Sequence, residues 1–111
     1  MRLHEYLSLI LDWFAIQYGC SREEAESDFL RKVCLPHVFA RTKIENGKRV
    51  TYYRNISELS IIETSSAIKR FKAYATTHAG VIIPDMEDME FMLHIKEEVE
   101  RNKNFLYGKE K

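Results

Sequence analysis

The Asn46-Gly47 pair limits how this chain can fold more than any other short feature. Asn-Gly is the sequence preferred in a two-residue type I′ turn, because both residues tolerate the positive φ angles that this turn requires. Valine, isoleucine, threonine, tyrosine and phenylalanine, which favour strands, occur on both sides of the pair. The sequence therefore predicts an antiparallel β-hairpin over residues 38–54.

A two-residue turn also determines which residues of the two strands lie opposite each other, and such pairs share a face of the sheet. The expected pairs, counted outward from the turn, are Glu45 with Lys48, Lys43 with Val50, Arg41 with Tyr52, and Phe39 with Arg54. One face then carries Arg41, Lys43, Lys48, Tyr52 and Arg54. The other face is expected to pack on the core through Val38, Ala40, Ile44, Thr51 and Tyr53.

Apolar residues recur at helical spacing before the hairpin, which predicts two helices there. The first covers about residues 3–18 and ends at Gly19, a residue suited to the left-handed conformation after a helix. The second begins at Ser21, which forms a capping box with Glu24, and ends before Pro36, because proline disfavours helix in the residue before it. Its expected apolar positions are Ala25, Phe29 and Val33, with Leu30 and Cys34 as further candidates.

Two more helices are predicted after the hairpin. Ser60 and Glu63 form a second capping box, and Gly80 ends the helix that Ser60 begins. A short extended connection follows over residues 81–84, and Asp85 is the expected cap of a last helix that runs to about Lys103. The residues expected to face the core are Ile68, Phe71 and Ala75 in the third helix and Met89, Met92, Leu93 and Val99 in the fourth.

These patterns together predict an α+β fold, mostly helical, with the order α-α-β-hairpin-α-α. A chain of 111 residues is short enough to form one core, so we expect a single domain over residues 1–111. The apolar runs are too short to cross a bilayer, and we expect no membrane partner. Two cysteines and the absence of a signal-peptide pattern favour free thiols in a reducing cytoplasm.

The positive charge of the chain is concentrated in its middle. The net charge is zero over the whole sequence, but residues 31–72 carry +7, between ends that carry −4 (residues 1–30) and −3 (residues 73–111). A polyanion responds to the local field within a Debye length of about 10 Å, so this distribution matters more than the total. A nucleic acid is therefore a suitable partner for the middle segment.

The basic face of the predicted hairpin is the main candidate site. Its cations are spaced along the strands so that they can follow successive phosphates, and Tyr52 can stack on an unpaired base. We expect single-stranded DNA to bind better than duplex, because no predicted helix carries the side chains that read a major groove. The alternative is a solvated hairpin face whose charges prevent edge-to-edge aggregation.

Three further cations in the third helix, Lys69, Arg70 and Lys72, are candidates to extend this surface. Lys69 and Lys72 are three residues apart and so share a side of the helix. The alternative is an ordinary solvated helix face.

Catalytic and metal sites find little support in the sequence. Cys34 and His37 have a ligand-like spacing, but a structural zinc site needs a second pair of ligands, and we expect neither a metal nor another cofactor. The carboxylates at Asp85, Glu87, Asp88 and Glu90 are expected to complement a helix N-terminus. For the methionines at positions 86, 89 and 92, core packing or a dimer seam is favoured over an adaptable partner-binding stripe.

Three segments of the second half of the chain point to a known family: Asn55-Ile56-Ser57-Glu58-Leu59-Ser60-Ile61-Ile62-Glu63, Ile68-Lys69-Arg70-Phe71-Lys72-Ala73-Tyr74-Ala75, and Ala79-Gly80-Val81-Ile82-Ile83-Pro84-Asp85. Through these segments much of the chain, about residues 3–90, resembles the NinB-type (Orf) recombination proteins of lambdoid phages. NinB-type proteins are longer and have an N-terminal β-rich portion that this chain lacks. The resemblance implies a non-catalytic recombination mediator in a bacterial host that binds single-stranded DNA and contacts the host single-stranded DNA-binding protein. A ring-like dimer that depends on the missing portion is not carried over, and a homodimer is kept only as a candidate partner.

Three functions follow as hypotheses. The first is a phage or prophage accessory protein of DNA recombination or replication that has no enzymatic activity. The second is a small adaptor or inhibitor that binds a host protein complex through the acidic ends of the chain. The third, which the sequence favours least, is a fragment of a metal-dependent nuclease.

Overall fold

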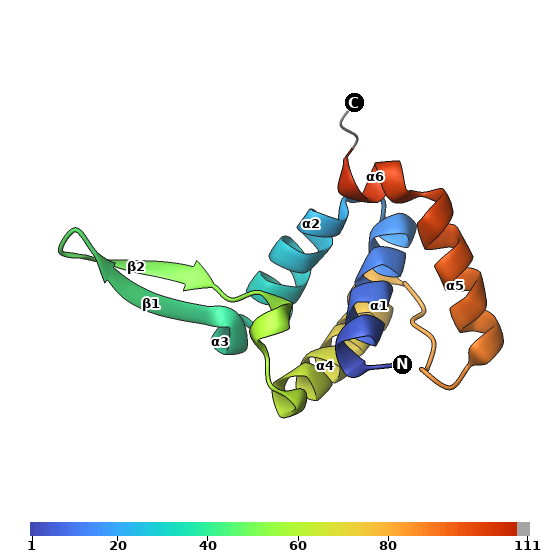
Figure 1. Ribbon diagram of the computed structural model, residues 1–111, viewed down its shortest axis with the longest axis horizontal. Coiled ribbons are helices and arrows are strands. Elements are labelled where there is room, and N and C mark those ends of the chain that lie inside the picture. The colour runs from blue at the N-terminus through green and yellow to red at the C-terminus, as the bar shows by residue number, and fades with distance from the viewer. Residues whose placement is uncertain (109–111) are drawn as a thin grey trace.

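The computed structural model describes residues 1–108, so residues 109–111 of the predicted domain lie outside the described part. It confirms the α+β class and the order of helices around one hairpin. In Figure 1, α1 lies inside the helical body between α2 and α5, and the hairpin extends away from the helices. The elements are α1 (Leu3–Tyr18), α2 (Arg22–Glu24), the π-helix η1 (Ala25–Cys34), α3 (Pro36–Phe39), β1 (Ala40–Glu45), β2 (Lys48–Tyr53), the 3-10 helix η2 (Ile56–Glu58), α4 (Ile61–Ala79), α5 (Met89–Arg101) and α6 (Lys103–Tyr107).

The predicted helix ends are formed by the residues that the sequence indicated. Ser21 Oγ accepts a hydrogen bond of 3.1 Å from the Glu24 amide, and the Glu24 carboxylate accepts one of 3.0 Å from the Ser21 amide. The same reciprocal box begins α4 at Ser60. Gly19 and Gly80 follow α1 and α4 with φ angles of 94° and 67°, in the left-handed region that glycine adopts without strain.

The second helical segment is a π-helix for most of its length, and this changes which residues reach the core. Its amide-to-carbonyl bonds span five residues, as in the 3.1 Å bond from the Leu35 amide to the Leu30 carbonyl. Ala25, Leu30 and Leu35 are therefore the buried positions, five residues apart. Val33 was predicted to be buried from an α-helical period and is instead 54% exposed.

The hairpin has the predicted turn and register. Asn46 and Gly47 adopt φ angles of 54° and 78°, and the strands pair as Glu45 with Lys48, Lys43 with Val50 and Arg41 with Tyr52. The strands are shorter than predicted, because Val38 and Phe39 belong to α3 and Arg54 follows β2. A backbone bond of 2.9 Å from the Arg54 amide to the Phe39 carbonyl still joins the predicted fourth pair.

The prediction that one hairpin face packs on the core is wrong beyond the base of the hairpin. Ala40 and Tyr53 are half-buried next to the helices, but Thr51 is exposed and Ile44 is 67% exposed. The physical reason is visible in Figure 1, where the two strands leave the helical body and no other element covers them. Both faces of the outer hairpin therefore meet solvent.

The last predicted helix begins later and is divided. Asp88, not Asp85, caps α5 by accepting a hydrogen bond of 3.2 Å from the Phe91 amide. The buried side of α5 is formed by Met92, Ile95 and Val99, so Met92 and Val99 are buried as predicted, while Met89 and Leu93 lie on a neighbouring side and are 75% and 60% exposed. A break at Asn102 separates α5 from α6.

The core surrounds α1, whose side chains also hold the connection between α4 and α5. Phe14 and Phe71 are fully buried and their rings meet edge to face at 5.0 Å. The Trp13 indole donates a hydrogen bond of 3.0 Å to the Ile82 carbonyl, and the Tyr6 hydroxyl donates one to the Pro84 carbonyl. Within the described residues, no helix has the length and apolar character needed to span a bilayer.

Candidate nucleic-acid interface

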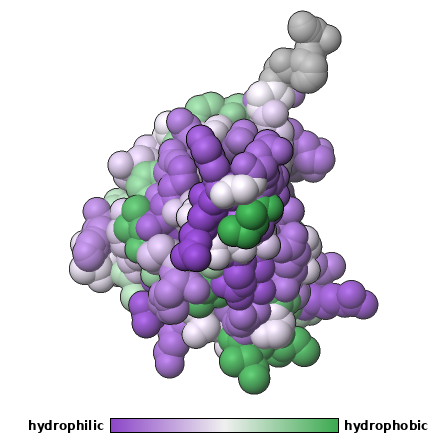
Figure 2. Space-filling view, turned by 90° about the vertical axis from the view of Figure 1, so that its left-hand side faces the viewer, coloured by the Kyte–Doolittle hydropathy of each residue, from purple (hydrophilic) through white to green (hydrophobic). Residues whose placement is uncertain are grey.

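The outer hairpin is the part of the predicted site that faces solvent. Figure 2 looks toward the side from which the hairpin projects, and hydrophilic residues cover most of this face. The cations of the hairpin differ in their contacts, however. Those at the base of the hairpin bond to other groups of the chain, and those near its turn are exposed to solvent.

Arg54 was predicted to bind DNA and instead stabilises the base of the hairpin. Its Nη2 donates a hydrogen bond of 2.6 Å to the Val38 carbonyl and forms an ion pair of 3.0 Å with Glu63, and the side chain is 15% exposed. The Ser60 amide and Arg54 both donate to the Glu63 carboxylate and lower its pKa. Arg54 therefore joins α3 to the start of α4 and is a poor phosphate ligand.

Arg41 is also turned back onto the chain. Its Nη1 donates hydrogen bonds of 3.1 Å to the Val38 carbonyl and 2.8 Å to the Ala40 carbonyl, and the residue is half-buried. These bonds satisfy carbonyl groups where the chain passes from α3 into β1. Arg41, like Arg54, is therefore engaged by the chain itself and is a poor phosphate ligand.

Lys43 and Tyr52 lie together on one face of the outer hairpin. The Lys43 ammonium is 5.2 Å from the centre of the Tyr52 ring and 3.2 Å from the Glu45 carboxylate. Both partners of that ion pair are at least half exposed, and an exposed pair of this kind is weak and readily exchanged for another anion. Tyr52 is 40% exposed, so its ring is accessible to a ligand.

Lys48 and Arg49 begin the second strand and are both exposed. Within residues 1–108, neither has an ion-pair partner. Arg49 was not among the predicted site residues, because the register places it opposite Ile44, on the face that was expected to be buried. The signal was available, since a charged residue at that position argues against a buried face.

The three cations of α4 do not form one surface with each other. Lys72 forms an ion pair of 2.8 Å with Asp85 and lies 5.9 Å from the centre of the Tyr6 ring. Burial lowers the pKa of Lys72, but its hydrogen bond to Asp85 and the field of the nearby groups outweigh burial and raise it overall. Lys69 lines a hollow at the start of α4, and Arg70 lines another beside η1. Lys72 is therefore engaged within the chain, while Lys69 and Arg70 are exposed.

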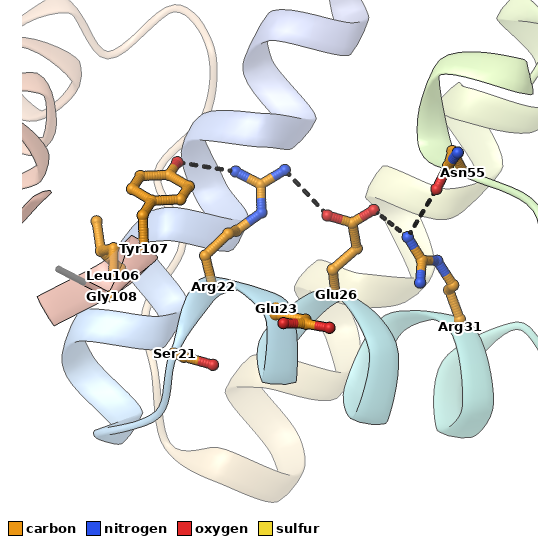
Figure 3. Close-up of a pocket in the computed structure, with 9 residues that line it drawn as sticks. All are labelled: Ser21, Arg22, Glu23, Glu26, Arg31, Asn55, Leu106, Tyr107 and Gly108. Carbon is orange, nitrogen blue, oxygen red and sulfur yellow. Dashed lines mark hydrogen bonds and ion pairs between the residues drawn. The ribbon is translucent and has the colours of Figure 1, made fainter. Parts of the chain in front are cut away.

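A polar cavity of about 530 Å³ lies between η1 and the C-terminal helix. Figure 3 shows a chain of bonds along it, from the Tyr107 hydroxyl through Arg22, Glu26 and Arg31 to Asn55. Arg22 is 3.3 Å from Glu26 and 2.9 Å from the buried Asp12. Cations and carboxylates alternate along this chain, so the cavity carries no excess charge that would select an ion. We interpret it as a structural network.

The remaining polar groups offer little chemistry. Thr64 Oγ1 lies 3.2 Å from the His4 imidazole, but Thr64 is fully buried and no substrate can reach it. Burial raises the pKa of the Cys34 thiol to about 11, which keeps it protonated, and neither Cys34 nor Cys20 is in a disulfide. In the described part of the chain, no group of three or more His, Cys, Asp or Glu residues is placed to hold a metal ion.

Comparison of the chain with protein-family models, with curated proteins and with solved structures finds no match. The resemblance to NinB-type proteins therefore stays a hypothesis from the sequence.

Proposed function

We propose that this protein binds single-stranded DNA through the outer part of its hairpin and catalyses no reaction on it. The interface consists of Lys43, Lys48 and Tyr52 on one face of the ribbon, with Arg49 on the other face next to the turn. One observation supports the proposal above all: these cations lie on a ribbon that projects from the helical body and are not engaged by the helices. This is the arrangement that leaves charge available to phosphates and a ring available to a base.

The wider role follows from the resemblance stated above. We infer an accessory protein of phage or prophage DNA recombination or replication that acts in the bacterial cytoplasm. Contact with the host single-stranded DNA-binding protein belongs to the same inference, and a homodimer is kept as a candidate partner. The adaptor or inhibitor hypothesis is the alternative, and DNA binding distinguishes the two.

A fluorescence anisotropy titration with a labelled oligothymidine of about 20 nucleotides tests the proposal, because this length exceeds the usual site of a small binding domain. Three phosphate contacts should release about 0.7 counterions each, so the logarithm of the binding constant should fall with the logarithm of salt concentration at a slope near −2. A duplex of the same length should bind more weakly. Salt-independent binding, no binding, or tighter binding of the duplex would contradict the proposal.

A further inference from the structure

Helix α5 borders an apolar hollow at the end of the molecule opposite the hairpin. Figure 1 places the hairpin and α5 on opposite sides of the helical body, whose longest dimension is 51 Å with the hairpin included. The hollow has a volume of about 660 Å³. Its apolar walls are Met86, Met89, Met92 and Leu93, and the carboxylates of Glu87 and Glu90 lie at its edge.

The side chains of this hollow are graded from buried to exposed. Met92 forms the floor with 4% exposure, whereas Met89 and Leu93 stand at the rim with 75% and 60% exposure. Met89 and Leu93 are four residues apart on α5, so they lie on the same side of the helix. Large apolar side chains gathered at a hollow mark an interaction surface, and flexible methionines adapt to a partner's shape.

A second hollow, of about 520 Å³, continues the first toward α1. The two share Met1 and Lys96 as walls, and the second is lined on the α1 side by Glu5 and Leu9. We refer to the two adjoining hollows, which lie beside the contact between α1 and α5, as the trough. Because the trough consists of two adjoining hollows, it suits an elongated ligand better than a single side chain.

The charge at the edges of this trough is negative. Glu5, Glu87 and Glu90 are exposed there, against two cations, Lys96 and the α-amino group of Met1. In the part of the chain that the structure describes, none of these three carboxylates has an ion-pair partner. A partner that fits must therefore place apolar groups in the trough and positive groups along its edges.

We propose that the trough binds an amphipathic helix of a partner protein, with an apolar stripe flanked by lysine or arginine. Helix-in-groove recognition requires this pattern of apolar anchors at helical spacing. A second copy of the chain fits less well, because a two-fold pairing through α5 would bring the Glu87 and Glu90 carboxylates of both copies together. The trough lies away from the hairpin, so a helix can bind there while the hairpin holds another ligand.

A synthetic peptide tests this proposal with the full chain. The probe is a fluorescein-labelled helical peptide of leucine and lysine. Its leucines follow the spacing i, i+3, i+4 and i+7, so that they form one stripe along the helix. The matched control peptide has glutamate in place of every lysine. By anisotropy, the lysine peptide should bind about tenfold or more tightly than the glutamate peptide. Its affinity should also fall as salt is added.

Matched variants locate the binding. Met89→Gln combined with Leu93→Gln should weaken the lysine peptide about tenfold or more. Ile61→Gln combined with Ile62→Gln removes equally exposed apolar groups, at 73% and 81%, from the start of α4 and should leave its affinity unchanged. All four sites are exposed, so both variants should keep the native circular dichroism spectrum and DNA affinity.

Three outcomes would overturn the proposal. The two peptides could bind equally well, or the folded variant of Met89 and Leu93 could bind the lysine peptide as tightly as the native protein. Sedimentation could also show a dimer that the same variant converts to a monomer, in which case a second copy covers the trough. The DNA titration is independent of all three, so failure here leaves the hairpin proposal standing.

Discussion

The Tyr107 hydroxyl donates a hydrogen bond of 2.7 Å to Asp12, a buried aspartate in the middle of α1. Arg22 donates to both of them, at 2.9 Å to Asp12 and 3.3 Å to Tyr107. The three side chains join α6 to α1 and α2, and Leu106 next to Tyr107 is 1% exposed. Leu106 and Tyr107 therefore dock α6 on the helices that precede it.

Tyr107→Phe tests this link through its pH dependence. Burial and the hydrogen bond to Asp12 raise the pKa of Tyr107 from 10.0 to about 12. A raised pKa means that the neutral phenol stabilises the fold fully below pH 10, and that this stabilisation is lost as the pH rises toward 12. Because the ring is 55% exposed, we expect Tyr107→Phe to lower the unfolding free energy at pH 8 by only about 1 kcal/mol.

Urea unfolding of both proteins between pH 8 and about pH 11 is the measurement. The difference in unfolding free energy should shrink as the pH rises above the ordinary pKa of tyrosine, 10.0. A difference that stays constant over this range would show that Tyr107 acts through packing and not through its hydroxyl.

Arg54 and Arg49 should give opposite results when each is replaced by alanine. Arg54→Ala removes a hydrogen bond and an ion pair at a half-buried site and leaves the Val38 carbonyl with one donor fewer, so it should lower stability by about 1.5–3 kcal/mol. Arg49→Ala should change stability by less than about 0.5 kcal/mol. Thermal unfolding and oligothymidine binding of the two variants check this: DNA affinity should fall for Arg49→Ala and not for Arg54→Ala.

The sequence predicted the structure correctly where a short motif determines the backbone conformation. The Asn46-Gly47 turn, the capping boxes at Ser21 and Ser60 and the glycine that ends α4 all act over a few residues, and the structure forms each of them. The register followed from the turn for the same reason. These features locate the hairpin and two of the principal helices.

Features that depend on distant contacts could not be predicted. The π-helical spacing of η1 buries Ala25, Leu30 and Leu35, and an α-helical period read from the sequence does not select these positions. The engagement of Arg54 depends on Glu63, which a register argument for the hairpin does not include. The exposure of Ile44 depends on whether any other element covers the hairpin, and no pattern within the hairpin contains that information. The structure shows that Arg49 is exposed on the outer hairpin and that Arg41, Arg54 and Lys72 are engaged within the chain, and a register argument predicts none of these contacts.

Phe39 and Ile44, which lie just before β1 and near its end, should differ sharply in how much their replacement by alanine lowers the unfolding free energy. Phe39, just before the strand, is fully buried, and Phe39→Ala should cost about 3–5 kcal/mol. Ile44 is 67% exposed, and Ile44→Ala should change the unfolding free energy by less than about 0.5 kcal/mol. Denaturant unfolding of both variants is the measurement, and a large loss for Ile44→Ala would mean that the outer hairpin packs against another surface in solution.

The central claim is that the outer hairpin binds single-stranded DNA. The most direct measurement compares oligothymidine affinity in two triple variants that remove the same charge. One replaces Lys43, Lys48 and Arg49 with alanine, and the control replaces the exposed Lys96, Arg101 and Lys103 at the opposite end of the molecule. The hairpin variant should lose affinity on the order of tenfold or more with a nearly unchanged melting temperature, and the control should lose little. Equal losses in the two variants, or full affinity in a folded hairpin variant, would contradict the claim.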